Sequence, residues 1–251
     1  MSVLLVSLEA GVLRLTLNRP DKRNALSAEL IEELHRAFER ADLDAETRVV
    51  LVTGAGKDFC AGADLDELLA SADRSVAENE AAALRLGSLF ERMRALPKPV
   101  LALVRGRALA GGAGLAGACD VVIAGAGSQL GYPEIQRGFV PAMVLALLRR
   151  AVGEKVALDL VLTGRLLSAE EAQRVGLVTR VVPDAELEPA ASGLAAELAR
   201  SSGSALALTK QLCYQLDGET LSAGIARGAE VNAVARATPD FRAAIAGFLK
   251  R

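Results

Sequence analysis

Residues 105–120 read RGRALAGGAGLAGACD, and this stretch sets the fold expected of the chain. The apolar run Pro99 to Val104 leads into it, which indicates a buried strand that ends at a turn rich in glycine and alanine. Because these residues carry little or no side chain, backbone N–H groups at the start of the following helix can approach a ligand closely. The stretch therefore predicts a site that holds a phosphate or a developing oxyanion.

The same stretch contains the pattern G-x-G-x-x-G at residues 112–117, which is typical of dinucleotide-binding folds. Those folds need a full crossover helix and an acidic residue about 20 residues further on. Here Asp120 and the apolar run 121–124 follow almost at once, which leaves a helix too short for the usual crossover. We therefore do not favour a nucleotide site, and a tightly packed Gly/Ala helix is the alternative interpretation of this segment.

A second strand-to-helix turn lies earlier in the chain. Residues 48–53 indicate a buried strand, and residues 57–65, KDFCAGADL, follow it with small residues before a helix start. The sequence GAGK at residues 54–57 lacks the spacing of a phosphate loop, and Asp58 stands where a hydroxyl residue is needed. Two such turns can supply two backbone N–H groups to one oxygen atom.

Composition indicates a soluble globular protein. The chain has 251 residues, of which 51% are hydrophobic and 24% charged, enough for a large core in one or two domains. The formal net charge of −2 gives no reason to expect nucleic-acid binding. We also expect no membrane span, no metal site, no targeting leader and a reducing, cytoplasmic location, since the three cysteines have no metal-type spacing: Cys60, Cys119 and Cys213.

Apolar patterning predicts an α/β fold with a helical tail. Residues 3–8 and 12–17 indicate a β-hairpin, and Ser27 caps a helix. Further elements are expected as a strand at 48–53, a helix at 76–96, strands at 100–104 and 121–124, and a short strand at 178–182 within a mostly helical remainder. The order of these elements gives repeated strand–strand–helix units.

Four ordered motifs resemble the crotonase, or enoyl-CoA hydratase/isomerase, superfamily over nearly the whole chain. They are NRPDKRNAL at 18–26, FCAGADL at 59–65, the stretch 106–120, and the helical motif within 162–178. The resemblance implies an α/β spiral core of β-β-α units over residues 1–189. It also implies a helical trimerisation domain over residues 190–251, and hence a homotrimer or a dimer of trimers.

The resemblance also implies a site for an acyl-CoA thioester. Its oxyanion hole would consist of the backbone N–H groups of Ala63 and Gly111, and Glu134 would be the catalytic acid and base. Coenzyme A would be part of the substrate, so no separate cofactor is expected.

Glu134 is also a candidate from its surroundings. It lies in the otherwise apolar turn 130–135, where an unpaired carboxylate has a raised pKa suited to proton transfer. The alternative is a carboxylate after Pro133 that a helix N-terminus stabilises. His35, the single histidine, falls on the polar side of its helix and is expected to be exposed, which argues against a Ser-His-Asp device.

Contacts with the acyl-CoA are implied by motif position alone. Lys22 and Arg23 match the family region near the adenine and phosphates, although an exposed charged turn is an equal alternative. Phe248 matches an aromatic residue that reaches the acyl-CoA site of a neighbouring subunit, where Lys250 and Arg251 could add positive charge. The other positions that match binding residues are Ala25, Ala61, Asp64 and Leu65.

One departure bears on the reaction. Hydratases of the superfamily usually carry a second glutamate three positions after the oxyanion glycine, and that position here is Gly114. We favour an enoyl-CoA hydratase, a lyase of the kind found in fatty acid metabolism. A Δ3–Δ2 enoyl-CoA isomerase, which needs one carboxylate, is the alternative. An acyl-CoA-binding protein without catalytic activity is an alternative of another class.

Overall fold

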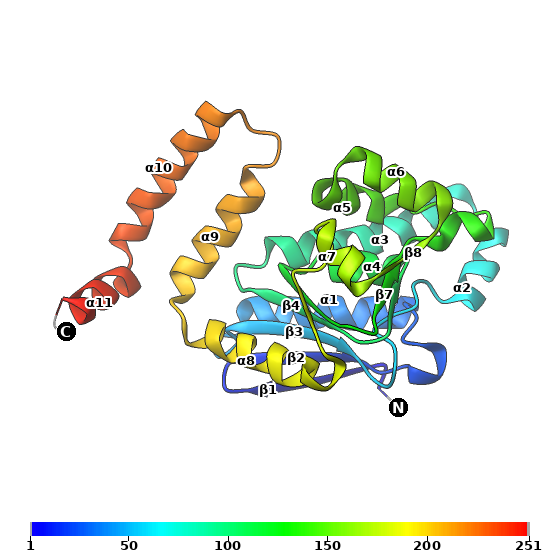
Figure 1. Ribbon diagram of the computed structural model, residues 1–251, viewed down its shortest axis with the longest axis horizontal. Helices are drawn as coiled ribbons and strands as arrows, with labels where there is room; N and C mark the ends of the chain where they lie inside the picture. Colours follow the sequence, from blue (N-terminus) through cyan, green and yellow to red (C-terminus); the bar gives the residue numbers. More distant parts are fainter. Residues whose placement is uncertain (1, 250–251) are drawn as a thin grey trace.

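A six-stranded sheet forms the frame of the computed structural model, which describes residues 2–249 (Figure 1). The first two strands form the predicted antiparallel hairpin, and every later neighbour in the sheet is parallel. In spatial order the strands are β1 (Leu4–Glu9), β2 (Val12–Leu17), β3 (Val49–Gly54), β4 (Val100–Val104), β6 (Val121–Gly125) and β9 (Arg180–Val182).

A second sheet of three strands stands beside the first. Strand β7 pairs in parallel with β5 and antiparallel with β8. The strands are β5 (Arg107–Leu109), β7 (Gln129–Gly131) and β8 (Leu166–Ser168). The chain therefore gives one strand to the large sheet, the next to the small sheet, and then forms a helix. The helices that follow are α4 (Gly111–Gly117) and the 3-10 helix η3 (Pro133–Arg137). The units β4–β5–α4 and β6–β7–η3 show this order, which confirms the predicted β-β-α spiral.

Both faces of the large sheet are buried at its central strands β3, β4 and β6, which explains the unbroken apolar runs there. In β3, Val50 and Val52 belong to the main core, whereas Val49 and Leu51 pack on the other face with helix α8 (Leu187–Arg200). The other helices before the C-terminal region are α1 (Ala28–Leu43), α2 (Leu65–Ala70), α3 (Val76–Ala95), α5 (Ala142–Val152), α6 (Glu154–Thr163) and α7 (Ala169–Arg174).

Helix α1 begins as predicted at Ser27, whose side chain accepts a hydrogen bond from the Leu30 N–H. The predicted exposure of His35 on this helix is wrong. Its side chain is 4% exposed, and its Nε2 lies 2.9 Å from the carbonyl oxygen of Arg85 on α3. The sheet buries one face of α1 and α3 covers part of the other, and a single apolar stripe does not reveal the second contact.

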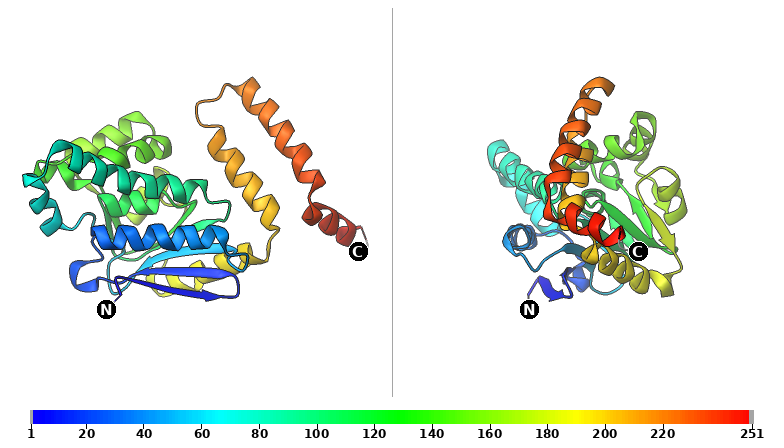
Figure 2. Two further views of the ribbon diagram at one scale, coloured as in Figure 1. Left: turned by 180° about the vertical axis from the view of Figure 1, so that it is seen from behind. Right: turned by 90° about the vertical axis from the view of Figure 1, so that its left-hand side faces the viewer.

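Helices α9 (Gly203–Gln215), α10 (Leu221–Ala237) and α11 (Pro239–Phe248) form an arm that projects from the core (Figures 1 and 2). The predicted domain boundary at 189/190 falls inside α8, and Leu187, Ala191 and Ala195 pack that helix on the large sheet. By its contacts, α8 belongs with the core, and the projecting part begins with α9.

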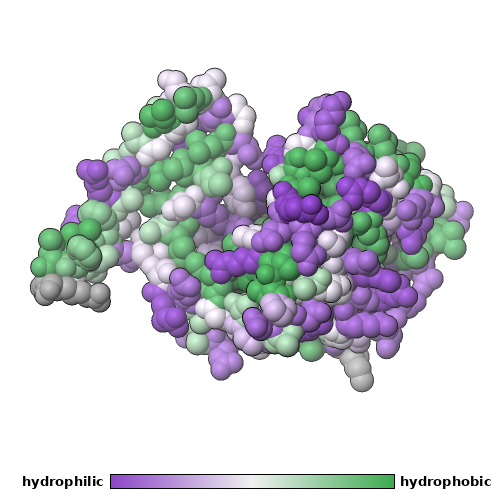
Figure 3. All heavy atoms as spheres, viewed as in Figure 1, coloured by the Kyte–Doolittle hydropathy of each residue, from purple (hydrophilic) through white to green (hydrophobic). Residues whose placement is uncertain are grey.

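Apolar side chains are exposed along the arm (Figure 3). They include Leu216, Leu221, Ile225, Val234, Phe241, Ile245 and Phe248. Within residues 2–249, no helix combines the length and the apolar character that crossing a bilayer requires.

Candidate active site

Backbone hydrogen bonds join successive turns of the spiral at the site. The Leu26 N–H donates to the Gly62 carbonyl at 2.8 Å, and the Asp64 N–H donates to the Leu26 carbonyl at 3.0 Å. Between these bonded groups, the Ala63 N–H has no acceptor within residues 2–249. The turn thus holds one backbone donor in place and leaves it available to a ligand.

Gly62 lets this first turn approach the second. Its φ of +97° favours glycine, and an added Cβ would lie 2.8 Å from the Cβ of Ala110 and 3.6 Å from the nitrogen of Gly111. The two small-residue turns predicted from the sequence therefore lie against each other.

The second turn is fixed by a strained residue at the start of α4. Ala110 has φ +52° and ψ −124°, outside the regions that residues with a Cβ favour. Its N–H donates to the carbonyl oxygen of Gly131 at 2.8 Å. Gly111 then begins the helix, where an N–H has no partner inside the helix, and it has none elsewhere in residues 2–249. A second free donor thus lies beside the first turn.

Glu134 lies on the next turn, three residues after the Gly131 that holds Ala110. The residue is 8% exposed, and its side-chain Oε2 has no hydrogen-bond partner within residues 2–249. Burial raises the pKa of this carboxyl, and its own backbone N–H and the charge of Arg137 only partly oppose that effect. Glu134 also lies in the first turn of η3 directly after Pro133, as the alternative interpretation expects, but burial outweighs this stabilisation of the charged form.

The space around Gly114 is closed. A Cβ at this position would lie 2.3 Å from Cγ1 of Val144 on α5 and 3.1 Å from Cζ of Phe90 on α3. These two apolar side chains fill the region into which a side chain at position 114 would project. Nothing in the sequence pattern marked either residue, because α3, α4 and α5 meet only in the folded chain.

We expect Gly114→Ala to lower the free energy of unfolding by about 1–3 kcal/mol, because the new methyl group overpacks this contact. Val144→Ala in the same chain should restore most of the loss by removing the opposing methyl groups. Chemical denaturation of both single variants and the double variant measures the coupling. Additive effects of the two substitutions would show that the side chains do not meet.

The charged residues before the first helix separate into two groups. The Nζ of Lys22 lies 2.7 Å from Oδ2 of Asp66, an ion pair that raises the lysine pKa. Arg23 instead lines a cavity of about 280 Å³ together with Lys57 and Arg107. The sequence did not predict a binding role for Lys57 or Arg107. Side chains alternate between the two faces of a strand, so the buried Ala108 on β5 implies that the neighbouring Arg107 faces the surface, where a cation can meet a ligand.

Asp64 is engaged within the protein. Arg19 lies 2.7 Å from its Oδ2 and holds the carboxyl pKa below its usual range. Its other oxygen accepts the Asp66 N–H at 3.0 Å at the start of α2. The carboxylate therefore supports the first turn, whereas exposed Leu65 follows it directly.

The remaining predicted contact residues take different positions. Ala25 is buried and its carbonyl accepts from Arg19 at 2.6 Å, and the Ala61 N–H donates to the Arg23 carbonyl at 3.0 Å. Phe248 is 74% exposed at the end of α11, a helix that lies far from α2 and α4 of its own chain (Figure 1). Lys250 and Arg251 lie outside the described residues.

A spiral of β-β-α units with a C-terminal helical region is the architecture of the crotonase class of proteins, to which the solved structures similar to this chain belong. The model of the enoyl-CoA hydratase/isomerase family matches residues 7–251. The chain therefore belongs to the enoyl-CoA hydratase/isomerase family.

Individual relatives cover nearly the whole chain. A candidate enoyl-CoA hydratase of Thermus thermophilus is 43% identical over 248 residues, 98% of each protein. The 2,3-dehydroadipyl-CoA hydratase of Escherichia coli is 40% identical over 253 residues, which cover 100% of this chain and 97% of the relative. The crystal structure of a Mycobacterium smegmatis enoyl-CoA hydratase superposes with a TM-score of 0.94 at 31% identity, covering 99% of this chain and 96% of that one.

Proposed function

We propose that the protein is an enoyl-CoA hydratase that adds water across the double bond of an acyl-CoA thioester. The observation that carries this proposal is the buried Glu134 carboxyl, unpartnered within residues 2–249, on a turn bonded to the turn of Gly111. The hydratase names of relatives along the full chain length support it.

The proposed reaction uses three groups. The thioester carbonyl oxygen accepts hydrogen bonds from the N–H groups of Ala63 and Gly111, which draws electron density from the conjugated double bond. Glu134 takes a proton from water as the oxygen of that water bonds to the β-carbon. The resulting enolate then takes that proton at the α-carbon from Glu134, so one carboxyl group serves first as base and then as acid.

A second candidate function is Δ3–Δ2 enoyl-CoA isomerisation. The observation that favours it is the closed space at Gly114, since Val144 and Phe90 leave no room for a second carboxylate. Glu134 would then remove a proton from the α-carbon and return it to the γ-carbon. A purely binding role is less favoured, because a buried carboxylate without a partner is costly to a protein that does not use it.

Cationic side chains that suit the phosphate groups of coenzyme A line one cavity of the protein. Arg23, Lys57 and Arg107 line one cavity with the single carboxylate of Asp58, so cations are in excess there. We propose that this cavity contacts phosphate groups of the substrate. We also propose assembly as a homotrimer or dimer of trimers, in which the exposed apolar side chains of the arm, Phe248 included, are covered by a neighbouring subunit.

Mass spectrometry of the products tests the reaction. With a 2-enoyl-CoA substrate, we expect a product that has gained one water molecule. With a 3-enoyl-CoA substrate, a product of unchanged mass but shifted double bond would support the isomerase instead. No turnover of either substrate by the folded protein would contradict both activities.

A further inference from the structure

Among the described residues of the three arm helices, the only buried side chain is a cation. Lys210 of α9 is buried, and no other described residue of α9, α10 or α11 is. Its Nζ lies 2.9 Å from the Met93 carbonyl, 3.0 Å from the Lys98 carbonyl and 2.9 Å from Oδ2 of Asp120. These acceptors satisfy all three donors of the ammonium group. The arm is thus fixed to the core by polar contacts at its one buried point.

The carboxylate of Asp120 joins three segments of the chain. Oδ2 also accepts the Val100 N–H at 2.7 Å, and Oδ1 accepts the hydroxyl of Tyr214 on α9 at 2.6 Å. The Asp120 N–H in turn donates to the Val100 carbonyl at 2.8 Å. One side chain therefore links α9, the start of β4 and the segment that follows α4.

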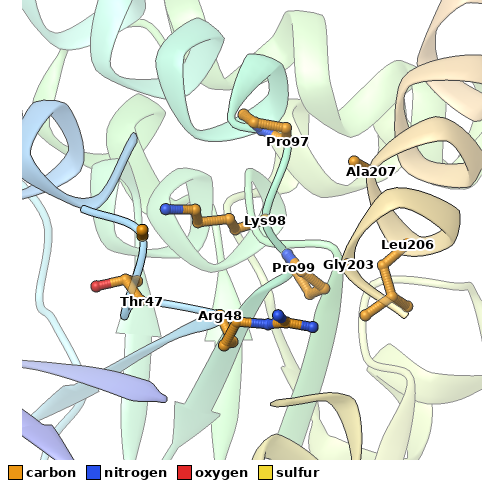
Figure 4. A pocket seen from close by; sticks show the side chains of 9 residues that line it. Thr47, Arg48, Pro97, Lys98, Pro99, Gly203, Leu206 and Ala207 are labelled. Carbon is orange, nitrogen blue, oxygen red and sulfur yellow. The ribbon is translucent and has the colours of Figure 1, made fainter. Parts of the chain in front are cut away.

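Packing between the arm and the core leaves a space at the start of α9. A cavity of about 200 Å³ lies between the start of α9 and the core, and its lining includes Arg48, Pro99 and Leu206 (Figure 4). Arg48 crosses this region to donate to the Ser201 carbonyl at 2.8 Å. The apolar side chains of α9, such as Leu206 and Leu212, are only half-buried, whereas the burial of Lys210 lowers its pKa despite the neighbouring Asp120.

We propose that Lys210 and Asp120 form a latch that holds the arm against the core and fixes the C-terminal end of helix α4. Asp120 follows the last residue of α4, Gly117, by three positions, and the seven-residue helix begins at Gly111. So short a helix moves as one body, and a displaced Asp120 shifts the Gly111 N–H. Lys210 and Asp120 are positioning residues, and the link to turnover rests on the proposed role of Gly111.

Lys210→Met tests the latch, because methionine retains much of the side-chain length and removes the charge. Hydrogen exchange of residues 203–215 should rise about tenfold or more in the assembled protein, as the arm detaches locally. With an enoyl-CoA substrate, kcat should fall roughly 10- to 100-fold through misplacement of the donor, while KM stays within about threefold. Lys210→Met/Asp120→Asn should lower kcat no further than Lys210→Met alone, since both substitutions break the same contact.

Arg150→Met is the matched control. Arg150 also joins the core to the arm, through Asp217 at 3.1 Å, but both side chains are about half exposed. This variant should keep wild-type exchange and kcat, because exposed ion pairs contribute little.

Each result decides one part of the proposal. Unchanged exchange of α9 in a folded Lys210→Met variant would overturn the latch, and raised exchange with unchanged kcat would overturn its link to α4. If Lys210→Met does not fold, Tyr214→Phe, which removes only the hydrogen bond to Asp120, should show both effects at smaller size; no effect would overturn the proposal. The exchange measurement stands even if Gly111 has no part in the reaction.

Discussion

Glu134→Gln is expected to lower the turnover of enoyl-CoA substrates by roughly 10²–10⁴-fold, the contribution of general acid–base catalysis. The amide fills the volume of the carboxyl group but takes no proton from water. Within residues 2–249, the position of a second carboxylate at Gly114 is closed by Val144 and Phe90, and His35 is buried between α1 and α3. Neither position offers a substitute base.

The same variant should fold at least as stably as the wild type at neutral pH. Burial raises the pKa of Glu134 in the folded state, so folding favours the protonated carboxyl and loses stability as pH rises through the folded-state pKa. Glutamine imitates the protonated form and removes that loss. Thermal denaturation and substrate-binding measurements therefore serve as controls for the kinetic assay.

The wild-type pH profile gives a further check on Glu134. Water addition needs the ionised carboxylate, so the acidic limb of kcat should lie above the pKa range of an ordinary glutamate and be absent in Glu134→Gln. A glutamine variant within a few-fold of wild-type turnover on 2-enoyl- and 3-enoyl-CoA would place the proton carrier elsewhere.

Gly111→Pro should reduce kcat by about 10²–10³-fold, the loss typical of one oxyanion donor. Gly111 is the first residue of α4, where the missing N–H leaves no helical bond unmade, but proline disfavours the φ of +52° and ψ of −124° of the preceding Ala110. The substitution thus removes the proposed donor at a cost to the turn, and thermal denaturation must show a folded variant before the kcat values are compared.

Gly111→Ala is the matched variant, because it adds a side chain and keeps the N–H. Its Cβ would lie 3.2 Å from a terminal methyl of Leu26 and 3.8 Å from one of Leu86, contacts that flexible side chains can relieve. Its kcat should stay well above that of the proline variant. Equal kcat values for the two variants, both folded, would show that the Gly111 N–H does not act on the substrate.

Local signals predicted much of this fold. Ser27 begins its helix where the cap indicated, and the strands at 100–104 and 121–124 pair as parallel neighbours in the large sheet. The glycines at 112 and 114 match the dinucleotide-binding pattern, but their role in the structure is a different one. A Cβ on Gly112 would lie 2.3 Å from the Cys60 carbonyl oxygen, and one on Gly114 equally close to Val144. Here close packing, rather than a pyrophosphate, requires glycine.

The sequence could not predict features that depend on distant partners. His35 is buried because α3 lies over it, and Lys210 looks like an ordinary helix lysine until Asp120, Met93 and Lys98 surround it. The cavity of Arg23, Lys57 and Arg107 gathers residues from two separate turns and from strand β5. Amphipathic periodicity reports one apolar face, and none of these contacts leaves a periodic signal.

Both proposed donors to the thioester are main-chain atoms, held by bonds such as Leu26–Gly62 and Ala110–Gly131. Substitution of most side chains that line the site leaves such atoms in place, so activation of the thioester depends mainly on the residues that hold these turns, as proposed for Lys210 and Asp120. The proton chemistry, by contrast, depends on individual side chains such as Glu134. Evolution can therefore change which bond is made or broken by exchanging a few side chains, while the scaffold continues to activate the same class of ester.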